Sequence, residues 1–309
     1  MRILVTGGNG FIGKHLCGQL NLLEGVTVAS LDYSSRLPHL LLDQGDGILR
    51  INQNILDYKS LEADFDNFRP HVVYHLAAKL GVQDVMDKPG ETVSENVLGT
   101  LHVVNLCKYY NAHLIFASTS DVYGKSVDLP FREDGMLSIG PSVEPRWSYA
   151  ISKLAGEHLT LASNGTVVRF FNVTGPGQSP KYVMPIMVGQ ALRGESITVH
   201  GDGASTRCFA DVRDIVAALV QFIDLPVDQI GGEIYNIGND KKISMWELAE
   251  MVRQYVNPHA EILSIPYTEG YTEMPNRVPW LGKIEGLLDG WKCQIGLKQI
   301  IEDLAVSMK

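Results

Sequence analysis

The sequence predicts an α/β protein in which a doubly wound parallel sheet is joined to a smaller, mainly C-terminal domain. Short apolar runs alternate with segments of helical spacing through the first half of the chain, and a glycine-rich turn separates the first run from the first helical segment. The alternation stops near residue 173, where glycine and proline gather over 175–180. Strands that alternate with helices indicate a parallel sheet covered on both faces.

Length and composition are those of a globular protein with a large core. The chain has 309 residues, of which 45% are hydrophobic and 20% are charged. This length exceeds that of one average domain. The net charge is −9, whereas a general nucleic-acid surface requires a basic face. We therefore expect no nucleic-acid partner.

The expected elements are short apolar runs for strands and apolar positions three or four residues apart for helices. The strands expected in the first half are 2–6, 26–32, 47–52, 71–77, 112–118 and 166–172, and the helices are 11–23, 94–110 and about 147–162. Beyond residue 173 we expect a helix over 185–194, a strand and turn over 197–203 and a helix over 243–256.

The change of rhythm near residue 173 divides the chain into two domains. We assign residues 1–172, together with about 208–240, to the first domain, because the second of these segments is expected to return to the sheet. The second domain then takes about 173–207 and 241–309.

Cysteine usage and the N-terminus bear on the compartment. The four cysteines, Cys17, Cys107, Cys208 and Cys293, are scattered without a Cys-x-x-Cys pair, so we expect reduced thiols and no metal site. The chain begins directly with a strand and has no signal-peptide pattern. No apolar run approaches the ~20 residues of a membrane span. We therefore expect a cytoplasmic protein without a membrane partner.

The stretch VTGGNGFIG places Gly7, Gly10 and Gly13 directly after the first strand and at the start of the first helix. Glycines there permit a tight turn and let the backbone approach a pyrophosphate, which the helix N-terminus attracts. Asp32 follows at the end of the second strand, 19 residues after Gly13. A carboxylate at that place accepts both ribose hydroxyls of NAD and repels a 2′-phosphate. The pattern thus predicts a Rossmann-type NAD site. Arg36 lies close enough to leave NADP as an alternative cofactor. The structural alternative is a glycine-rich turn in which Asp32 is only a capping residue.

The stretch RWSYAISK places Tyr149 and Lys153 four residues apart, on one face of a helix. A phenol has a pKa of about 10, and a nearby ammonium together with the positive nicotinamide of NAD⁺ lowers it toward the range of a usable base. The structural alternative is a helix with a surface lysine and a half-buried tyrosine. The glycine turn and the Ser/Thr row at 118–120 favour the catalytic interpretation.

The GxxGxxG spacing, the HLAA stretch at 75–78 and the Tyr-x-x-x-Lys pattern resemble the extended short-chain dehydrogenase/reductase family. The resemblance covers essentially the whole chain. It implies NAD as cofactor, a nucleotide-sugar substrate and a second domain that binds that substrate. It also implies the cofactor-binding residues Gly7, Gly10, Phe11, Ile12, Gly13, Asp32, Asn54, Ile55, Leu76, Ala77, Ala78, Asn96, Tyr149 and Lys153.

The resemblance also implies catalytic roles. Tyr149 takes a proton from a sugar hydroxyl while C4 passes a hydride to NAD⁺, and Lys153 holds the nicotinamide ribose and biases the tyrosine. Thr119 matches the residue that hydrogen-bonds the same hydroxyl, and Asn96 matches one that supports the active-site helix. Asn54 departs from the family pattern, which usually has Asp before Ile at the adenine contact. Lys79 lies one residue short of a nicotinamide-site lysine of the galactose epimerases, so we assign it no role.

Ser120 and Asp121 complete a Thr-Ser-Asp row where dehydratases and decarboxylases of the family usually have Thr-Asp-Glu or Thr-Ser-Glu. Simple 4-epimerases often have no acid there. Aspartate is shorter than glutamate by one carbon–carbon bond, about 1.5 Å, which matters when a proton must be taken at about 2.6–3.2 Å. Asp121 is therefore a base at C5, a hydrogen-bond partner of the backbone or a capping residue.

Three residues match substrate contacts of the family. Asn172 matches a phosphate contact, and Arg207 and Arg277 match two arginines that clamp the pyrophosphate of a nucleotide sugar. Guanidinium groups suit this task because they offer paired donors to phosphate oxygens. The structural alternative for either arginine is a solvated surface charge.

Two branches of the family share features with the chain. The stretch 140–153 resembles the UDP-glucuronate decarboxylases, in which an arginine matching Arg277 is implicated in decarboxylation, whereas 79–90 looks more like the epimerases. We predict an NDP-sugar 4-epimerase that acts through a 4-keto intermediate. The alternatives are a dehydratase, a UDP-glucuronate decarboxylase, a net C4 dehydrogenase and a non-catalytic NAD-binding sensor.

The expected helices 94–110 and 147–162 have apolar positions on more than one side, at Leu98, Val103, Leu106, Leu154 and Leu159. In the resembled family such helices pair across a two-fold axis, so we expect a homodimer. Packing against the sheet alone is the other interpretation.

Overall fold

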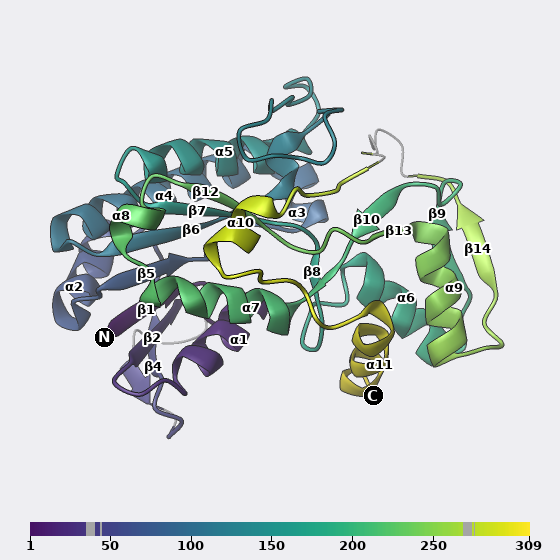
Figure 1. Ribbon diagram of the computed structural model, residues 1–309, viewed down its shortest axis with the longest axis horizontal. Coiled ribbons are helices and arrows are strands. Elements are labelled where there is room, and N and C mark those ends of the chain that lie inside the picture. The colour runs from purple at the N-terminus through teal and green to yellow at the C-terminus, as the bar shows by residue number, and fades with distance from the viewer. Residues whose placement is uncertain (35–40, 44, 268–273, 275) are drawn as a thin grey trace. The chain divides into compact units, whose positions relative to one another are not determined.

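The computed structural model describes residues 1–34, 41–43, 45–267, 274 and 276–309. Two compact units divide the chain (Figure 1). The first unit contains Met1–Gly124, Leu137–Arg169 and Val216–Tyr235, and the second contains Lys125–Met136, Phe170–Ile215 and Asn236–Lys309.

An eight-stranded sheet is the centre of the first unit, in the order β12-β7-β6-β5-β1-β2-β4-β3. Strands β6, β5, β1, β2 and β4 run parallel, and β3 is antiparallel to β4. The strands are β1 (Arg2–Thr6), β2 (Thr27–Asp32), β3 (Leu41–Asp43), β4 (Leu49–Asn52), β5 (Val72–His75), β6 (His113–Thr119), β7 (Thr166–Phe170) and β12 (Ile234–Ile237).

The helices of this part of the chain cover both faces of the sheet. Figure 1 shows α2, α4 and α5 on one side of the sheet and α1 on the other. Buried side chains of α2 and α4 pack with those of the central strands in one hydrophobic cluster. The helices are α1 (Phe11–Leu20), α2 (Tyr58–Phe68), α3 (Val82–Asp87), α4 (Pro89–Tyr110), η1 (Ser120–Tyr123), α5 (Trp147–Leu161), α7 (Val212–Gln221), η2 (Phe222–Asp224) and α8 (Val227–Ile230).

The strand order determines where a ligand can approach the sheet. The chain runs from β1 outward to β2 and β4, then returns to the other side of β1 as β5. In parallel α/β sheets, ligands bind beyond the carboxyl ends of the strands at such a reversal. The turn after Thr6 and the segment after His75 therefore flank the expected binding crevice.

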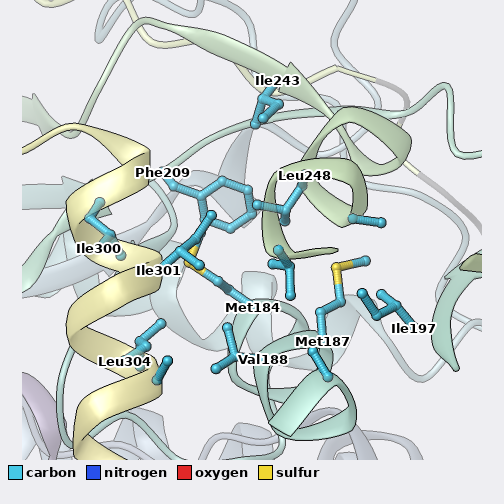
Figure 2. Close-up of a cluster of buried hydrophobic side chains, with 14 of the residues drawn as sticks. Met184, Met187, Val188, Ile197, Phe209, Ile243, Leu248, Ile300, Ile301 and Leu304 are labelled. Carbon is cyan, nitrogen blue, oxygen red and sulfur yellow. The ribbon is translucent and has the colours of Figure 1, made fainter. Parts of the chain in front are cut away.

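The second unit has its own hydrophobic core. Figure 2 shows buried side chains of α6, α9 and α11 gathered around Met184 and Phe209. The described residues of this unit also form three two-stranded sheets. The elements are β8 (Val173–Thr174), α6 (Val183–Leu192), β9 (Ile197–His200), β10 (Thr206–Cys208), β11 (Ala210–Asp211), β13 (Lys242–Ser244), α9 (Met245–Val256), β14 (Ile262–Ile265), α10 (Gly282–Leu287) and α11 (Leu297–Ser307).

The fold class and the elements expected in the first half agree with the structure, and the differences lie mainly at their ends. Helix α4 begins at Pro89, five residues before the expected start. A proline fits there because the first helical N–H has no partner within the helix. Helices α2, α3, α7, α8, α10 and α11 were not predicted from the sequence.

The unit boundaries differ from those expected in several segments, of which 170–172 is the shortest and belongs to the second unit. Residues 125–136 belong to the second unit, because Phe131 N–H donates to Val278 O and Trp280 N–H donates to Phe131 O, both at 2.8 Å. Residues 208–215 and 236–240 also belong to the second unit.

Candidate active site

Backbone contacts require glycine at two positions, one in the turn after β1 and one in the first turn of α1. Gly7 has φ = 71°, and a Cβ atom there would lie 2.7 Å from Ala77 N. A Cβ atom on Gly13 would lie 2.2 Å from Gly7 O. Helix α1 begins at this turn with Gly10 as its N-cap residue, which has no side chain to cap the first N–H groups. The turn thus presents backbone donors in a close-packed cradle.

Asp32 lies at the end of β2 and contacts this cradle. Asn9 N–H donates to Asp32 Oδ2 at 2.9 Å, and Tyr33 N–H donates to Oδ1 at 2.8 Å. The side chain is half-buried, and each carboxylate oxygen can accept a further hydrogen bond. Gly8, which was not predicted as a site residue, also lacks room for a side chain, because a Cβ atom there would lie 2.3 Å from Ser30 Oγ. The pair Gly7–Gly8 was the available signal.

The segment after β5 closes against the glycine turn. Leu76 N–H donates to Thr6 O at 3.0 Å, and Ala77 N–H lies 3.3 Å from Thr6 Oγ1. Leu76, Ala77 and Ala78 are half-buried. Gly7 and Ala77 therefore lie side by side at the point where the strand order reverses. A dinucleotide binds across this point in such sheets.

Helix α5 carries Tyr149 and Lys153 on one face. The Lys153 side chain is buried, its Nζ donates to Ala117 O at 2.8 Å, and it lies 6.0 Å from the centre of the Tyr149 ring. Burial lowers the pKa of Lys153 to about 7, although the negative charge of Glu157 opposes this shift. The lysine is thus not a solvated surface cation.

The Thr-Ser-Asp row lies where β6 ends and the short helix η1 begins. Thr119 caps η1, since its Oγ1 accepts a hydrogen bond from Asp121 N–H at 3.2 Å. Ser120 is buried, whereas Thr119 and Asp121 are half-buried. Capping accounts for one lone pair of the Thr119 hydroxyl, and its proton and second lone pair can serve another partner.

Asn96 joins three segments of the first unit. Its Oδ1 accepts a hydrogen bond from Lys79 N–H at 2.7 Å, and its Nδ2 donates to Lys79 O and to Ser152 Oγ at 3.1 and 3.0 Å. Ser152 Oγ donates to Tyr149 O at 2.8 Å. Asn96 therefore connects α4 to the segment after β5 and to α5. Lys79 itself forms ion pairs with Glu91 and Glu95.

Asn54 and Ile55 have local roles in the turn after β4. Asn54 Oδ1 accepts a hydrogen bond from Leu56 N–H at 2.9 Å. The Ile55 side chain lies against Gly99, where a Cβ atom would be 2.5 Å away, and its carbonyl is 2.8 Å from His102 Nδ1.

A buried ion pair behind α5 was missed by the sequence analysis. Arg169 of β7 donates from Nε and NH2 to the two oxygens of Glu157 at 2.9 and 2.7 Å, and both side chains are 2% exposed. Glu157 follows Lys153 by four residues, so it extends the Tyr149–Lys153 face by one turn. That spacing was the signal in the sequence.

The second unit brings together two of its three predicted substrate contacts. Arg207 NH1 donates to Met274 O at 2.9 Å, and Arg277 NH2 lies 3.8 Å from Met274 Sδ. Thr206 and Asn276 form a β-bridge, which sets Arg207 and Arg277 side by side. Asn172 adopts φ = 29°, and its Nδ2 donates to Cys208 O at 3.3 Å.

The described residues also bear on metal binding, on the cysteines and on membrane spans. Over the described residues, no group of His, Cys, Asp and Glu side chains could hold a metal ion. All four cysteines are free thiols. None of the described helices is long and apolar enough to cross a membrane. Arg36, on which the NADP alternative depends, lies outside the described residues.

The parallel sheet, the glycine cradle, Asp32 and the Tyr149–Lys153 helix define a dinucleotide-binding α/β protein. Residues 3–238 match the NAD dependent epimerase/dehydratase family, and the chain belongs to this family. The chain is 36% identical to the UDP-N-acetyl-alpha-D-glucosaminuronate decarboxylase of Bacillus cytotoxicus, with 97% of each chain covered.

Solved structures of epimerases share the fold. The UDP-glucose 4-epimerase of Thermotoga maritima, crystallised with UDP-glucose, has a TM-score of 0.87 at 27% identity over 100% of this chain and 98% of that chain. The UDP-glucuronic acid 4-epimerase of Bacillus cereus, in complex with UDP-glucuronic acid and NAD, has a TM-score of 0.86 at 27% identity over 100% and 99%. These findings confirm the fold class, the resemblance and NAD as the cofactor. The chain is an NAD-dependent enzyme that modifies a nucleotide-linked sugar.

Proposed function

We propose that the enzyme decarboxylates a UDP-linked hexuronic acid and that UDP-N-acetylglucosaminuronate is its first candidate substrate. The observation that carries this proposal is the 36% identity to a UDP-N-acetylglucosaminuronate decarboxylase over nearly the full length of both chains. The sequence patterns predicted a 4-epimerase, whereas the similarity to this decarboxylase favours the other branch.

The proposed reaction begins at O4 of the sugar. Tyr149 takes the O4 proton, and Thr119 holds the same hydroxyl through its remaining hydrogen-bonding capacity. NAD held by the glycine turn and Asp32 would supply the oxidant for C4 and the reductant that restores it. Lys153 holds the ribose and, when protonated, favours the phenolate of Tyr149.

The 4-ketone makes the C6 carboxylate a β-keto acid. The C5–C6 bond then breaks, CO₂ leaves, and the electron pair forms an enolate over C5, C4 and O4. This step needs no base at C5, so the short side chain of Asp121 does not prevent it. A proton from water then adds at C5 in place of CO₂, and Tyr149 returns its proton to O4 as the C4 ketone is reduced.

Asp121 distinguishes decarboxylation from elimination. If CO₂ is lost from C5, Asp121→Asn should keep the decarboxylation rate within about tenfold, because no proton is removed from C5. If Asp121 were a general base at C5, the same substitution would lower the rate by about 10²–10⁴-fold. The rate at which the nucleotide sugar is consumed, measured together with CO₂ release, decides between the two roles.

The second unit is proposed to hold the UDP part of the substrate. Arg207 and Arg277 lie next to each other around Met274, so their guanidinium groups can share one pyrophosphate. Asn172 is proposed to add a phosphate contact. Arg277 is also the residue proposed to act on the sugar carboxylate.

A second candidate function is 4-epimerisation of a UDP-sugar. It is favoured by the TM-scores of 0.87 and 0.86 to two UDP-sugar 4-epimerases over the whole chain. In that reaction the 4-ketone forms by the same proton transfer to Tyr149, and reduction from the other face of the sugar inverts C4.

Mass spectrometry of the nucleotide sugar after incubation tests the proposal. UDP-N-acetylglucosaminuronate, UDP-glucuronate, UDP-N-acetylglucosamine and UDP-glucose are each incubated with the enzyme and NAD⁺, with Tyr149→Phe as the inactive control. Loss of CO₂ from a uronate supports decarboxylation. An unchanged mass with a new chromatographic peak would replace it by epimerisation, and loss of water by dehydration. Accumulation of NADH would indicate a net dehydrogenase, and no turnover of any sugar would favour the sensor.

A further inference from the structure

The segment that carries Thr119, Ser120 and Asp121 is hydrogen-bonded at both ends to one buried ion pair. At its start, Ser118 Oγ donates to Glu157 Oε1 at 2.5 Å. At its end, Arg169 NH1 donates to the Tyr123 hydroxyl at 2.9 Å. Glu157 and Arg169 are partners in the buried ion pair described above. The segment is therefore attached twice to a single ion pair.

The ion pair is suited to fix a position. Two parallel N–H···O bonds restrict the guanidinium and the carboxylate to one relative orientation. Ser118, Tyr123, Glu157 and Arg169 are all at most 3% exposed, so water does not compete for these bonds. Buried and fully hydrogen-bonded polar groups of this kind add structural specificity more reliably than they add stability.

Two hydrogen bonds, one of them to Glu157 of the ion pair, join strand β6 to helix α5. Lys153 Nζ donates to Ala117 O, and Glu157 accepts from Ser118, so successive residues of β6 bond to successive turns of α5. Tyr149 lies one turn before Lys153 on the same face. These two bonds fix the end of β6, just before Thr119, against the helix that carries Tyr149.

We propose that Glu157 and Arg169 form a positioning pair that holds Thr119 in register with Tyr149 through Ser118 and Tyr123. The proposal rests on the proposed function in one respect, the assignment of Thr119 and Tyr149 to the reacting hydroxyl. Neither Glu157 nor Arg169 touches substrate in this scheme. Their effect reaches the reaction only through the placement of the segment 118–123.

The test removes each attachment while leaving the ion pair in place. Ser118→Ala deletes the bond to Glu157, and Tyr123→Phe deletes the bond to Arg169. Tyr74→Phe is the matched control, because the Tyr74 hydroxyl is also buried and donates to Leu219 O at 2.6 Å. The NAD-loaded enzyme is assayed with the nucleotide sugar that it turns over.

Ser118→Ala and Tyr123→Phe are each expected to lower kcat about tenfold, with KM and bound NAD changed less than about twofold. The double variant should lose less than the product of the two effects, because both bonds place one segment. Tyr74→Phe should lose stability but keep kcat. Unchanged kcat in both single variants, or an equal loss of kcat in Tyr74→Phe, would overturn the proposal.

A second readout does not depend on which sugar is the substrate. The ultraviolet absorbance of the phenolate, measured as the difference between each protein and its Tyr149→Phe counterpart, gives the pKa of Tyr149 in the holoenzyme. Ser118→Ala should raise this pKa, because a looser β6 no longer holds Lys153 near the phenol. An unchanged pKa of Tyr149 would contradict the positioning pair even if every tested sugar proved inert. A failure of the positioning pair can therefore be distinguished from a failure of the proposed function.

Discussion

At the scale of single residues, the site depends on positions where one added atom would collide with the backbone. Gly13 is the clearest case, because a Cβ atom there would meet Gly7 O at 2.2 Å and Gly8 Cα at 2.8 Å. Gly18 lies in the same helix, α1, and a Cβ atom there would meet nothing within 4 Å. The two glycines therefore form a matched pair for experiment.

Gly13→Ala is expected to destabilise the protein by about 2–3 kcal/mol and to yield enzyme purified without NAD, since neither colliding atom belongs to a flexible side chain. Gly18→Ala should keep NAD and gain up to about 1 kcal/mol of stability, because alanine favours the helix. Urea unfolding and the NAD content of the purified proteins measure both effects. A Gly13→Ala protein with full NAD occupancy would refute the role of the cradle.

The charge of Lys153 makes activity depend on pH. The negative charge of Glu157 raises the pKa of Lys153 against the larger effect of burial. Among the groups that face the lysine, His75 is neutral near pH 7, since burial and the lysine charge lower its pKa to about 3. Arg169 is a fixed positive charge beyond Glu157. Removing the carboxylate therefore lowers the pKa of Lys153 further.

Glu157→Gln is expected to move the alkaline limb of the kcat–pH profile to lower pH. The ammonium form of Lys153 favours the Tyr149 phenolate, and a lower lysine pKa means that this form is lost earlier as pH rises. Glutamine at position 157 still offers a carbonyl oxygen to Arg169. The control is Glu24→Gln, which removes an exposed carboxylate. An alkaline limb at unchanged pH would show that the charge on Lys153 does not limit the reaction.

At the scale of elements, Asn96 holds the active-site helix to its neighbours. Its side chain makes three hydrogen bonds, two to the backbone of Lys79 and one to Ser152. Asn96→Ala should cost about 2–3 kcal/mol of stability, because it leaves buried polar groups unpaired. It should also weaken NAD retention, while Asn105→Ala, on an exposed face of α4, should change neither. Thermal unfolding with and without added NAD⁺ measures both effects.

The helices α4 and α5 also bear on the homodimer. Val103 and Leu106 are buried in the core of the first unit, so packing within the unit accounts for them. Leu98 and Ile151, by contrast, are 45% and 38% exposed. We propose that these exposed side chains meet their counterparts in a second copy of the chain.

Light scattering should therefore give a dimer for the unmodified protein and a monomer for Leu98→Glu combined with Ile151→Glu, since the new charges would lose their water at the interface. Leu22→Glu is the control, because Leu22 is equally apolar, 75% exposed and placed after α1. A monomer at micromolar concentration for the unmodified protein would contradict the proposal.

At the scale of the whole molecule, the two units are proposed to bind different ligands. The cradle, Asp32 and helix α5 belong to the first unit, whereas Asn172, Arg207 and Arg277 belong to the second. A ligand that binds only the native state slows hydrogen exchange where it contacts the backbone. Exchange can therefore assign each ligand to a unit.

NAD⁺ is expected to protect the amides of residues 7–14, and UDP those around 172–174 and 206–208. Mass-spectrometric hydrogen exchange with each ligand alone makes the comparison, and α2, which supplies none of the proposed contacts, is the internal control. Protection of residues 7–14 by UDP would contradict the division of roles.

The sequence by itself determined the features that depend on the spacing of residues close together in the chain. Alternating apolar runs predicted the parallel sheet, and the spacing of Gly7, Gly10 and Gly13 before Asp32 predicted the NAD turn. The spacing of Tyr149 and Lys153 placed both on one face of α5. These features follow from the fixed periods of helices and strands and from the steric freedom of glycine.

Only the tertiary structure decided which distant residues meet. Glu157 contacts Ser118, 39 residues away, and Tyr123 contacts Arg169, 46 residues away. Residues 125–136 joined the second unit through Phe131 and Val278. No local period encodes such contacts, because each depends on how separate strands and helices pack. The positioning pair therefore became visible only once β6, α5 and β7 lay side by side.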